Sequence, residues 1–436
     1  MSALDRYVVL GVAQVRAPWF REVARWATSA MVPMEFVKAM SIEEVRVRLR
    51  TGRSYSALLV DDAMVGVDRD VIGLAQDVGC AVVVVDSGRA VRTWSDLGVS
   101  AVLPSTFDRD DLVQVLAQVA TPIARHVEGP AVSAPRTDPD GYRGRLVAVT
   151  GAGGTGRSTL AIALAQGLAA DPRYHDVVCL VDLALDAEQA MLHASPDVVP
   201  GLVEVVDAHR AGTPTVDDVR GLCWAVPERG YHLVLGLRRH RDWTAVRPRA
   251  FTAALDGLRH SFRLVVADVD ADVEGETSTG SLDVEERNTM ARVTLAAADL
   301  VVVVGTPGMK GLHALLRTTR ALLAHGVSSD HVVPVINRAP KGPGARAELT
   351  AAFGALLDLG PDQQLPSPVH LADRRHLDDA FRDGTRLPDA WLAPLCTVVM
   401  GLLDGMASRP DLEATRPSDG LTPVPPGQLG SWSEEP

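Results

Sequence analysis

The chain has 436 residues, 47% of them hydrophobic and 22% charged, which is typical of a soluble globular protein with sizeable cores. This length predicts about two to three domains, and the net charge of −12 argues against nonspecific nucleic-acid binding, because neutralising phosphates requires a basic surface. The four cysteines lie far apart with no CxxC pair, which indicates buried free thiols in a reducing compartment and neither a zinc site nor a disulfide framework.

The sequence contains no recognisable membrane signal. The N-terminus has no charged-then-apolar signal pattern, and no uninterrupted apolar run reaches about 18 residues. We therefore expect a cytoplasmic protein without a transmembrane segment, which reaches the inner face of a membrane only through partners. The apolar stretch 389–407 has no basic face for membrane contact and is predicted to be a core helix.

The first 123 residues predict an α/β unit. Ser41 is the expected N-cap of its second helix, and Glu44 three residues later completes a capping box. Five strands alternating with helices predict a parallel sheet that is covered on both faces. The strands are expected at 7–13, 33–40, 56–62, 80–87 and 100–107.

A second α/β unit is predicted for residues 145–408. Residues 124–144 before it are rich in proline, glycine and charge and predict a linker, and residues 409–436 predict a disordered tail. The connection 271–290 is long and polar and directly follows a strand, which is more typical of a functional or mobile segment than of a structural one. Strands are expected at 145–151, 176–183, 231–237, 262–270, 299–307 and 331–338.

The stretch TGAGGTGRSTLA, residues 150–161, has the spacing of a phosphate-binding loop between a strand and a helix. Glycines let backbone N–H groups turn inward around an anion, and the helix that follows points its positive end at the phosphates. Ser158 is placed to ligate Mg²⁺. Arg157 stands where such loops carry lysine; it keeps the charge on a wider, planar head. The alternative is a glycine-rich turn that binds no nucleotide. The predicted nucleotide-binding residues here are Gly151, Gly153, Gly154, Thr155, Gly156, Arg157, Ser158 and Thr159.

Carboxylates follow two of the predicted strands, at the ends where α/β sheets assemble their sites. Asp182 ends one strand, and Asp268 follows four apolar residues in the arrangement that orients Mg²⁺ through water. Asp270 and Asp272 come next and are weaker candidates, because aspartate is also common in turns. Asn337 ends the last strong strand, where its amide has the chemistry to bond a purine edge.

Together these residues resemble the MinD/ParA branch of P-loop ATPases, which carry the deviant Walker A loop KGGxxK[ST]. The segment AGGTGRS, residues 152–158, lies on that pattern. The resemblance covers about residues 145–405 and implies that ATP and Mg²⁺ are cofactors and that the protein is a homodimer. It also implies that Asp182 belongs to the first catalytic switch, that Asp268 together with Ser158 serves the metal, and that Asn337 and Arg338 contact adenine.

Residues 6–123 resemble a response-regulator receiver domain in strand order. Asp61 or Asp62 ends the third strand, where the phospho-acceptor would be, and Ser87 ends the fourth. The first strand lacks the acidic pair that holds Mg²⁺, and Ser105 stands in place of the expected lysine. This predicts a pseudo-receiver that serves as an interaction or dimerisation module. A degenerate receiver joined to a MinD-like ATPase is the architecture of the CpaE/TadZ family, which acts in assembly of Tad/Flp pili.

The sequence departs from the MinD/ParA pattern at three positions. Ala152 replaces the signature lysine, Arg157 replaces the loop lysine, and Ala184 stands where the family has a second, water-positioning aspartate. Asp186 is the candidate substitute for that aspartate, and Lys310 is a weaker candidate for the missing cation. Because phosphoryl transfer depends on positioned charge, the three changes predict slow or absent ATP hydrolysis.

Three functions remain open from the sequence. The first is a CpaE/TadZ-like localisation or assembly factor for a pilus or related secretion machinery, which binds ATP and hydrolyses it poorly. The second is an active MinD/ParA ATPase that positions cargo or the division site, with Arg157 and Asp186 supplying the missing chemistry. The third is a structural scaffold with an empty loop. The predicted fold in every case is α/β, with a receiver-like five-stranded parallel domain followed by a MinD/ParA-type P-loop NTPase domain.

Overall fold

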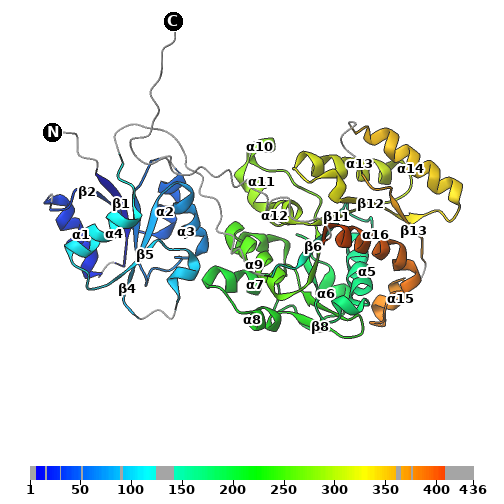
Figure 1. The fold of residues 1–436 in the computed structure, drawn as a ribbon, viewed down its shortest axis with the longest axis horizontal. Coiled ribbons are helices and arrows are strands. Elements are labelled where there is room, and N and C mark those ends of the chain that lie inside the picture. The colour runs from blue at the N-terminus through cyan, green and yellow to red at the C-terminus, as the bar shows by residue number, and fades with distance from the viewer. Residues whose placement is uncertain are drawn as a thin grey trace, which may run out of the picture.

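The computed structural model describes residues 6–14, 17–29, 31–50, 53–88, 92–123, 142–359, 365–374 and 377–407. These residues form two α/β units that lie side by side (Figure 1). The predicted tail lies outside the described residues, as does the predicted linker except for residues 142–144.

The first unit is a five-stranded parallel sheet with strand order β2-β1-β3-β4-β5, which confirms the predicted fold class. This is the doubly wound order 2-1-3-4-5. Its helices lie on both faces, and two separate hydrophobic cores result. The elements are β1 Tyr7–Val12, α1 Pro18–Thr28, β2 Met34–Ala39, α2 Ile42–Arg50, β3 Ala57–Asp61, α3 Arg69–Asp77, β4 Ala81–Asp86, η1 Trp94–Leu97, β5 Ala101–Pro104 and α4 Arg109–Val119.

Side-chain caps fix where these helices begin. The N–H of Glu44 donates to Oγ of Ser41, as predicted, but the Glu44 carboxylate accepts from the N–H of Met40, one residue before the expected partner. A full capping box does begin α4, where Asp108 and Asp111 each accept from the other's backbone N–H.

The second unit is an eight-stranded sheet with strand order β13-β12-β11-β6-β10-β7-β9-β8. From β6 the chain moves to one side of the sheet, returns to β10 beside β6, and then crosses to β11 and beyond on the other side. The elements are β6 Arg145–Gly151, α5 Arg157–Ala169, η2 Pro172–Tyr174, β7 Val178–Leu183, α6 Gln189–Leu192, α7 Leu202–Ala211, α8 Val216–Gly221, β8 Trp224–Val226, β9 Tyr231–Val234, η3 His240–Ala245, α9 Pro248–Ser261, β10 Leu264–Val269, α10 Glu276–Thr279, α11 Leu282–Arg287, α12 Thr289–Ala297, β11 Leu300–Gly305, α13 Met309–Ala324, η4 Ser329–His331, β12 Val332–Ala339, α14 Pro343–Leu357, β13 Val369–Ala372, α15 Leu377–Arg382 and α16 Asp389–Ala407.

All six strands expected in the second unit are present, and two short edge strands were not predicted. β8 has three residues and pairs antiparallel with β9, and β13 has four residues and pairs parallel with β12. Neither strand is long enough to show a clear apolar period. The sheet is therefore mixed at one edge and parallel elsewhere.

Successive strand residues point into two cores on opposite faces of this sheet. Leu146 and Ala148 belong to the core beneath α7, α9, α12 and α13, whereas Val147 and Val149 belong to the core beneath α5 and α16. Because both faces are covered, the strands read as continuous apolar runs.

Helix α16 is the one helix among the described residues that is long and apolar enough to cross a membrane by length and composition. One face of it packs against α5, where Gly167 permits the close approach of Cys396. The side chain of Gln166 bonds both the N–H and the carbonyl of Leu387, and this fixes the chain just before α16. This contact accounts for the apolar face. The buried residues of α16 are Trp391, Leu392, Leu395, Cys396, Val399 and Leu403.

The four cysteines are free, as predicted. Cys80, Cys179 and Cys396 are buried, and burial raises the pKa of the Cys80 thiol to about 12. Cys223 is half-buried. In the described part of the chain no cluster of histidine, cysteine and carboxylate side chains has the arrangement of a metal site.

The two units contact each other through α3, which packs on α7 and α9. Arg69 donates to the carbonyl oxygens of His209 and Gly212 near the end of α7. The buried Asp70 accepts a 3.0 Å hydrogen bond from the N–H of Arg249 in the first turn of α9, so one unit caps a helix of the other. Desolvation by burial raises the pKa of this carboxyl.

We expect Asp70→Ala to loosen this junction, because α9 would lose its cap, which costs about 1 kcal/mol in typical cases. Small-angle scattering should show a larger radius of gyration for the variant than for the native protein. Asp77→Ala is the matched control, since Asp77 lies on the same helix and pairs with Arg249 at the exposed rim. An unchanged scattering profile for Asp70→Ala would contradict a junction held by this cap.

Candidate functional site

The loop between β6 and α5 has the conformation of an anion cradle. Gly154 and Gly156 have φ of +78° and +88°, and Thr155 folds back so that its N–H and Oγ1 both donate to the carbonyl of Ala152. Left-handed glycines within such a loop turn successive N–H groups to one side. The cradle therefore fits the phosphates of a nucleotide, with the N-terminus of α5 facing them.

Two close approaches hold this loop in place. A Cβ on Gly151 would lie 2.4 Å from the carbonyl oxygen of Val304, and a Cβ on Gly156 would lie 2.5 Å from Nδ2 of Asn337. The same Nδ2 donates to the carbonyl of Thr155 at 2.9 Å, and Oδ1 of Asn337 accepts from the N–H of Arg338. Asn337, predicted to contact adenine, is here engaged at both ends of its amide in positioning the loop.

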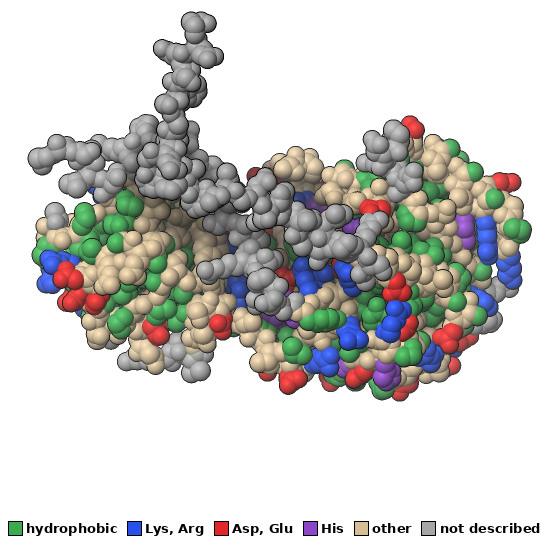
Figure 2. All heavy atoms as spheres, in the orientation of Figure 1, with side chains coloured by type: hydrophobic (Ala, Val, Ile, Leu, Met, Phe, Trp, Pro, Cys, Tyr) green, Lys and Arg blue, Asp and Glu red, His purple; other side chains and the backbone are tan. Residues whose placement is uncertain are grey.

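A cavity of about 640 Å³ opens over the loop. Figure 2 shows acidic and basic side chains interspersed over the second unit on the face in view. Charges of both signs also alternate around the cavity, which limits how much net attraction it offers an anion. Its lining residues are Gly151, Ala152, Gly153, Gly154, Gly156, Arg157, Ser158, Thr159, Leu185, Asp186, Glu188, His240, Asp270, Ala271, Asp272, Arg287 and Arg338.

Arg157 does not extend along the cradle but ion-pairs with two carboxylates. Its Nε lies 2.7 Å from Oδ1 of Asp268 and its Nη1 lies 2.6 Å from Oδ1 of Asp270. Only 14% of the Arg157 side chain is exposed, and Asp268 is fully buried. Burial opposes the charge of Arg157, but the two carboxylates outweigh it and raise the pKa of the guanidinium.

Gln189, at the start of α6, links the two predicted strand-end carboxylates. Its Nε2 donates to Oδ2 of Asp268 at 2.8 Å, and its backbone N–H donates to Oδ2 of Asp182 at 2.9 Å. Asp182 and Asp268 are register partners on β7 and β10. Burial and the neighbouring Asp268 carboxylate raise the pKa of Asp182 well above its usual range. Asp182 lies beneath the cavity and does not line it.

The arrangement does not fit Mg²⁺ at the predicted position. Both carboxylate oxygens of Asp268 have a donor, one from Arg157 and one from Gln189. Ser158, the other predicted ligand, lines the cavity, but the Asp268 carboxylate is already paired with the guanidinium of Arg157. A hard divalent cation needs oxygen ligands that are not already paired with a cation. The residues present thus fit phosphate and do not fit the metal.

Asp186 lies at the mouth of the cavity, where its Oδ1 is 2.9 Å from Nδ1 of His240 on η3. Its side chain is 86% exposed. The Asp182 carboxylate instead bonds the N–H groups of Ala184 and Gln189. The catalytic roles predicted for Asp182 and Asp186 stay predictions, and of the two only Asp186 borders the cavity.

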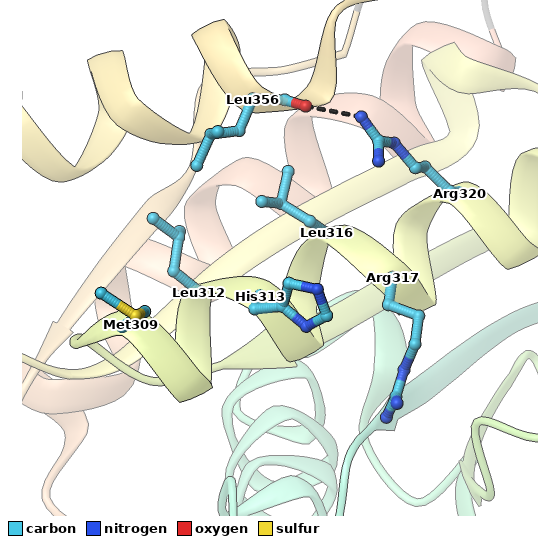
Figure 3. Close-up of a pocket in the computed structure, with 7 residues that line it drawn as sticks. All are labelled: Met309, Leu312, His313, Leu316, Arg317, Arg320 and Leu356. Atoms are coloured by element: carbon cyan, nitrogen blue, oxygen red, sulfur yellow. Dashed lines mark hydrogen bonds between the residues drawn. The ribbon is translucent and has the colours of Figure 1, made fainter.

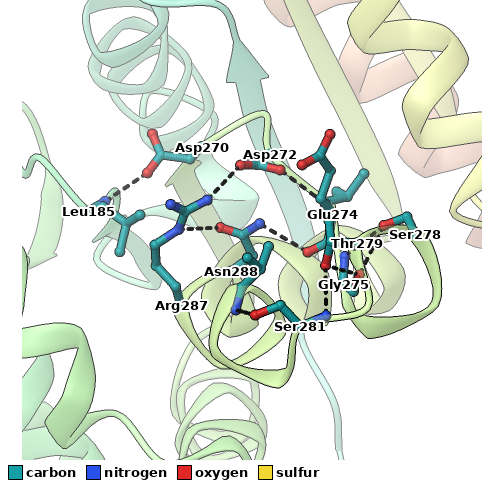
Figure 4. Close-up of polar contacts among 12 residues, drawn as sticks. Leu185, Asp270, Asp272, Glu274, Gly275, Ser278, Thr279, Ser281, Arg287 and Asn288 are labelled. Atoms are coloured by element: carbon teal, nitrogen blue, oxygen red, sulfur yellow. Dashed lines mark hydrogen bonds and ion pairs between the residues drawn. The ribbon is translucent and has the colours of Figure 1, made fainter.

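The connection 271–290 is ordered into α10, α11 and the start of α12 by a polar network (Figure 4). Arg287 donates to Oδ2 of Asp272 and to Oδ1 of Asn288, whose Nδ2 donates to the carbonyl of Glu274. Asp270 meanwhile accepts from the N–H of Leu185, so this segment is joined to the end of β7. These hydrogen bonds link the connection to its own helices and, through Asp270, to the end of β7.

A smaller cavity of about 250 Å³ adjoins the phosphate loop. It shares Gly156, Thr159 and Arg338 with the larger one. Phe381 and Trp391 supply aromatic surface to its wall, and Arg338 is exposed at its edge with φ of +55°. A flat apolar ring fits such a wall.

Among the described residues of the first unit, the carboxylates at the position of a phospho-acceptor are buried. Asp61 accepts from the indole N–H of Trp19 and from the N–H of Ala63. Asp62 accepts from both the N–H and the hydroxyl of Ser87, and its other oxygen is buried without a partner among the described residues. Both carboxylates are nine-tenths buried, which favours a structural role over phosphotransfer.

An apolar cavity of about 470 Å³ lies between α13 and α14, away from the loop (Figure 3). Met309, Leu312, Leu316 and Leu356 form its surface, and Arg320 donates to the carbonyl of Leu356. Lys310, the weaker candidate for the missing cation, is exposed on the same helix and does not line either cavity at the phosphate loop.

His193 lies four residues after Gln189 and is partly buried. Its Nδ1 lies 2.8 Å from the carbonyl oxygen of Gln189, and its Nε2 lies 2.6 Å from the Tyr231 hydroxyl. Burial lowers the pKa of His193 to about 4. A histidine whose pKa is depressed in the folded state contributes stability above its unfolded pKa near 6.5, and that stability is lost as pH falls toward 4.

We expect the native protein to lose about 2–3 kcal/mol of unfolding free energy between pH 6.5 and 4 through this group. His193→Phe should flatten that part of the stability curve, as measured by urea unfolding at several pH values. His260→Gln, at an exposed histidine, serves as the control. If the unfolding free energies of His193→Phe and the native protein fall in parallel from pH 6.5 to 4, His193 is not the group responsible for the loss.

Several site residues carried no usable signal in the sequence. Gln189 and His240 lie in segments without a motif, and they reach the site only because α6 and η3 return to the ends of β7 and β9. Arg287 lies in the polar connection 271–290, whose composition does not distinguish one residue from its neighbours. Asp270 was a weak candidate and proves to be a direct partner of Arg157.

No protein-family profile matches this sequence, and no curated protein matches it. Solved structures of low sequence identity do match. A ParA family ATPase from Chlorobium tepidum is 14% identical over 61% of this chain and 94% of its own, with a TM-score of 0.43. The cell division ATPase MinD from Pyrococcus furiosus is 15% identical over 59% and 99%, with a TM-score of 0.44. The septum site-determining protein MinD from Pyrococcus horikoshii, solved with Mg-ADP, is 15% identical over 61% and 99%, with a TM-score of 0.43.

Proposed function

We propose that this chain is a nucleotide-binding protein of MinD/ParA type that binds ATP and hydrolyses it weakly or not at all. Its cellular role would be that of a CpaE/TadZ-like localisation or assembly factor for a Tad/Flp pilus or a related secretion machinery. It would act in the cytoplasm and reach the inner face of the membrane through its partners.

The observation that carries the nucleotide part of the proposal is the cradle from Gly151 to Ser158. Two left-handed glycines and the folded-back Thr155 shape it, and Asn337 holds it in place. The adjoining cavity, with Phe381 and Trp391 in its wall, has the size and chemistry for a purine. The two cavities meet at Gly156, Thr159 and Arg338, as a triphosphate joined to a base requires.

Weak hydrolysis follows from the charges around the cradle. No lysine lines the larger cavity, and Arg157 is paired with Asp268 and Asp270. The position of a water-orienting carboxylate is the buried Ala184, and Asp186 is paired with His240. Because the transition state of phosphoryl transfer is stabilised by positioned cations, these features support a nucleotide-holding protein over a fast enzyme.

The N-terminal unit would be the interaction module. Its strand order is that of receiver domains, and its buried strand-end carboxylates bond Trp19 and Ser87. It docks on α7 and α9 through α3, and Arg50 at the end of α2 ion-pairs with Glu286 on α11, so α1 and α4 would face a partner or a second copy of the chain. In a homodimer, the interface between the two copies would be formed either by this unit or by the nucleotide-binding face of the second unit.

Titration calorimetry with ATP tests the proposal, and a turnover assay separates it from an active ATPase that positions cargo. We expect ATP to bind and phosphate release to stay at background. Turnover that is well above background and lost in Asp186→Ala would favour the active ATPase. Absence of ATP binding at millimolar nucleotide would remove the nucleotide part of the proposal and leave a scaffold.

A further inference from the structure

The Arg157 guanidinium is paired with two carboxylates at the end of β10, and one of them, Asp268, is the predicted metal-orienting residue. Nε and Nη1 are held by Asp268 and Asp270, which come from β10 and the residue directly after it. The side chain reaches them from the first residue of α5, beside the cradle. One cation of the protein thus bridges the loop to the carboxylates, as a metal ion would otherwise do.

We infer that this loop binds a nucleoside triphosphate without a divalent cation, because Arg157 takes the place of the metal. The inference rests on the proposed function. The charge of Asp268 is already compensated, and its second oxygen accepts from Gln189. A Mg²⁺ ion arriving with the nucleotide would have to displace a buried guanidinium from two carboxylates before it gained a ligand there.

The shape of arginine matters to this arrangement. The guanidinium holds two carboxylates with two different nitrogens at 2.7 and 2.6 Å, and its third nitrogen, Nη2, has no hydrogen bond to the described residues. That nitrogen is left to donate to a phosphate oxygen in the cavity that Arg157 lines. A lysine has one compact ammonium and does not span the same pair of carboxylates in a fixed fork.

Two other arginines line the cavity beside its four carboxylates, Asp186, Glu188, Asp270 and Asp272. Arg338 is exposed at the point where the two cavities meet, and Arg287 lines the larger one while bonded to Asp272. Arginine binds phosphate through paired N–H donors. The phosphates of a metal-free nucleotide would therefore meet guanidinium groups and backbone N–H groups.

The experiment is ATP titration of the full chain in excess EDTA and again in excess MgCl₂. We expect dissociation constants that agree within about threefold, since the metal adds no ligand at Asp268. Binding that is tightened about tenfold or more by Mg²⁺ would overturn the inference and leave the proposed function standing. No binding in either buffer would overturn both.

Arg157→Lys is the informative variant. It keeps the positive charge but frees at least one carboxylate, so Mg²⁺ should now strengthen ATP binding by about tenfold or more. Arg173→Lys makes the same chemical change at an exposed arginine that pairs with Asp171 and lines neither cavity. Its ratio of affinities with and without Mg²⁺ should stay that of the native chain. If the ratio of ATP affinities with and without Mg²⁺ is unchanged in Arg157→Lys, the inference is overturned. Thermal melting of the two variants would detect a loss of structure.

Discussion

Arg157→Met is expected to lower the unfolding free energy by about 3–5 kcal/mol, the range typical of removing one partner from a buried ion pair. Asp268 is fully buried, and the Nε of Arg157 lies 2.7 Å from it. Without the guanidinium, the Asp268 carboxylate would keep only Gln189 as a side-chain donor and would lie in register with the carboxyl of Asp182. Urea unfolding at pH 7 measures the loss.

The double variant Arg157→Met/Asp268→Asn separates the charge effect from a packing effect. Removing both charges leaves no fully buried ion without a partner, because Asp270 is 28% exposed and keeps the N–H of Leu185, so the double variant should recover most of the loss, as replacement of both partners does in other buried pairs. Arg173→Met is the exposed control, because its pairs with Asp171 and Asp404 lie at the solvated surface, where ion pairs contribute little to stability. Equal losses for Arg157→Met and Arg173→Met would contradict the role given to the buried pair.

The strands of both sheets were predictable because they are apolar throughout and bounded by turns. Val301 to Val304, for example, are completely or almost completely buried between two layers of helices, and nothing but a core strand suits such a run. The phosphate loop was predictable for a related reason. Glycines at the spacing of Gly151 and Gly156 are required wherever the backbone approaches Val304 and Asn337 so closely.

What the sequence did not reveal is the orientation of long side chains. The same Arg157 that was expected to face phosphate turns to Asp268 and Asp270, because a buried carboxylate needs a cation more than an open cavity does. Gln189 follows the same rule at the other oxygen of Asp268. Such choices depend on what lies nearby in space, and the partners of Arg157 are more than a hundred positions away along the chain.

The contact between the two units also depends on distant residues, and it lies on α9, the element that follows the cavity-lining η3. Asp70 of α3 caps α9 at Arg249, and nine positions earlier His240 on η3 bonds Asp186 at the mouth of the cavity. The docking contact and this part of the cavity wall therefore lie nine residues apart along the chain.

Gly156→Ala is expected to weaken ATP binding by at least about 100-fold, because two costs fall on the loop at once. The left-handed φ of +88° costs about 1–2 kcal/mol for a residue with a Cβ. The new methyl group would lie 2.5 Å from Nδ2 of Asn337 and would break its hydrogen bond to the carbonyl of Thr155. Titration calorimetry of the variant measures the loss of affinity.

Asn337→Ala supplies the background that distinguishes the two costs. With the amide gone, Gly156→Ala meets no steric conflict, so in that background it should cost only the backbone strain. The losses of ATP-binding free energy caused by the two substitutions should therefore be less than additive by about 1–3 kcal/mol. If Asn337 contacts adenine and does not hold the loop, the two effects should instead be independent and their free energies should add. Gly154→Ala tests the backbone strain alone, since Gly154 has a similar φ of +78° and a Cβ there meets nothing within 4 Å. It should lower the unfolding free energy by the same amount as Gly156→Ala does in the Asn337→Ala background.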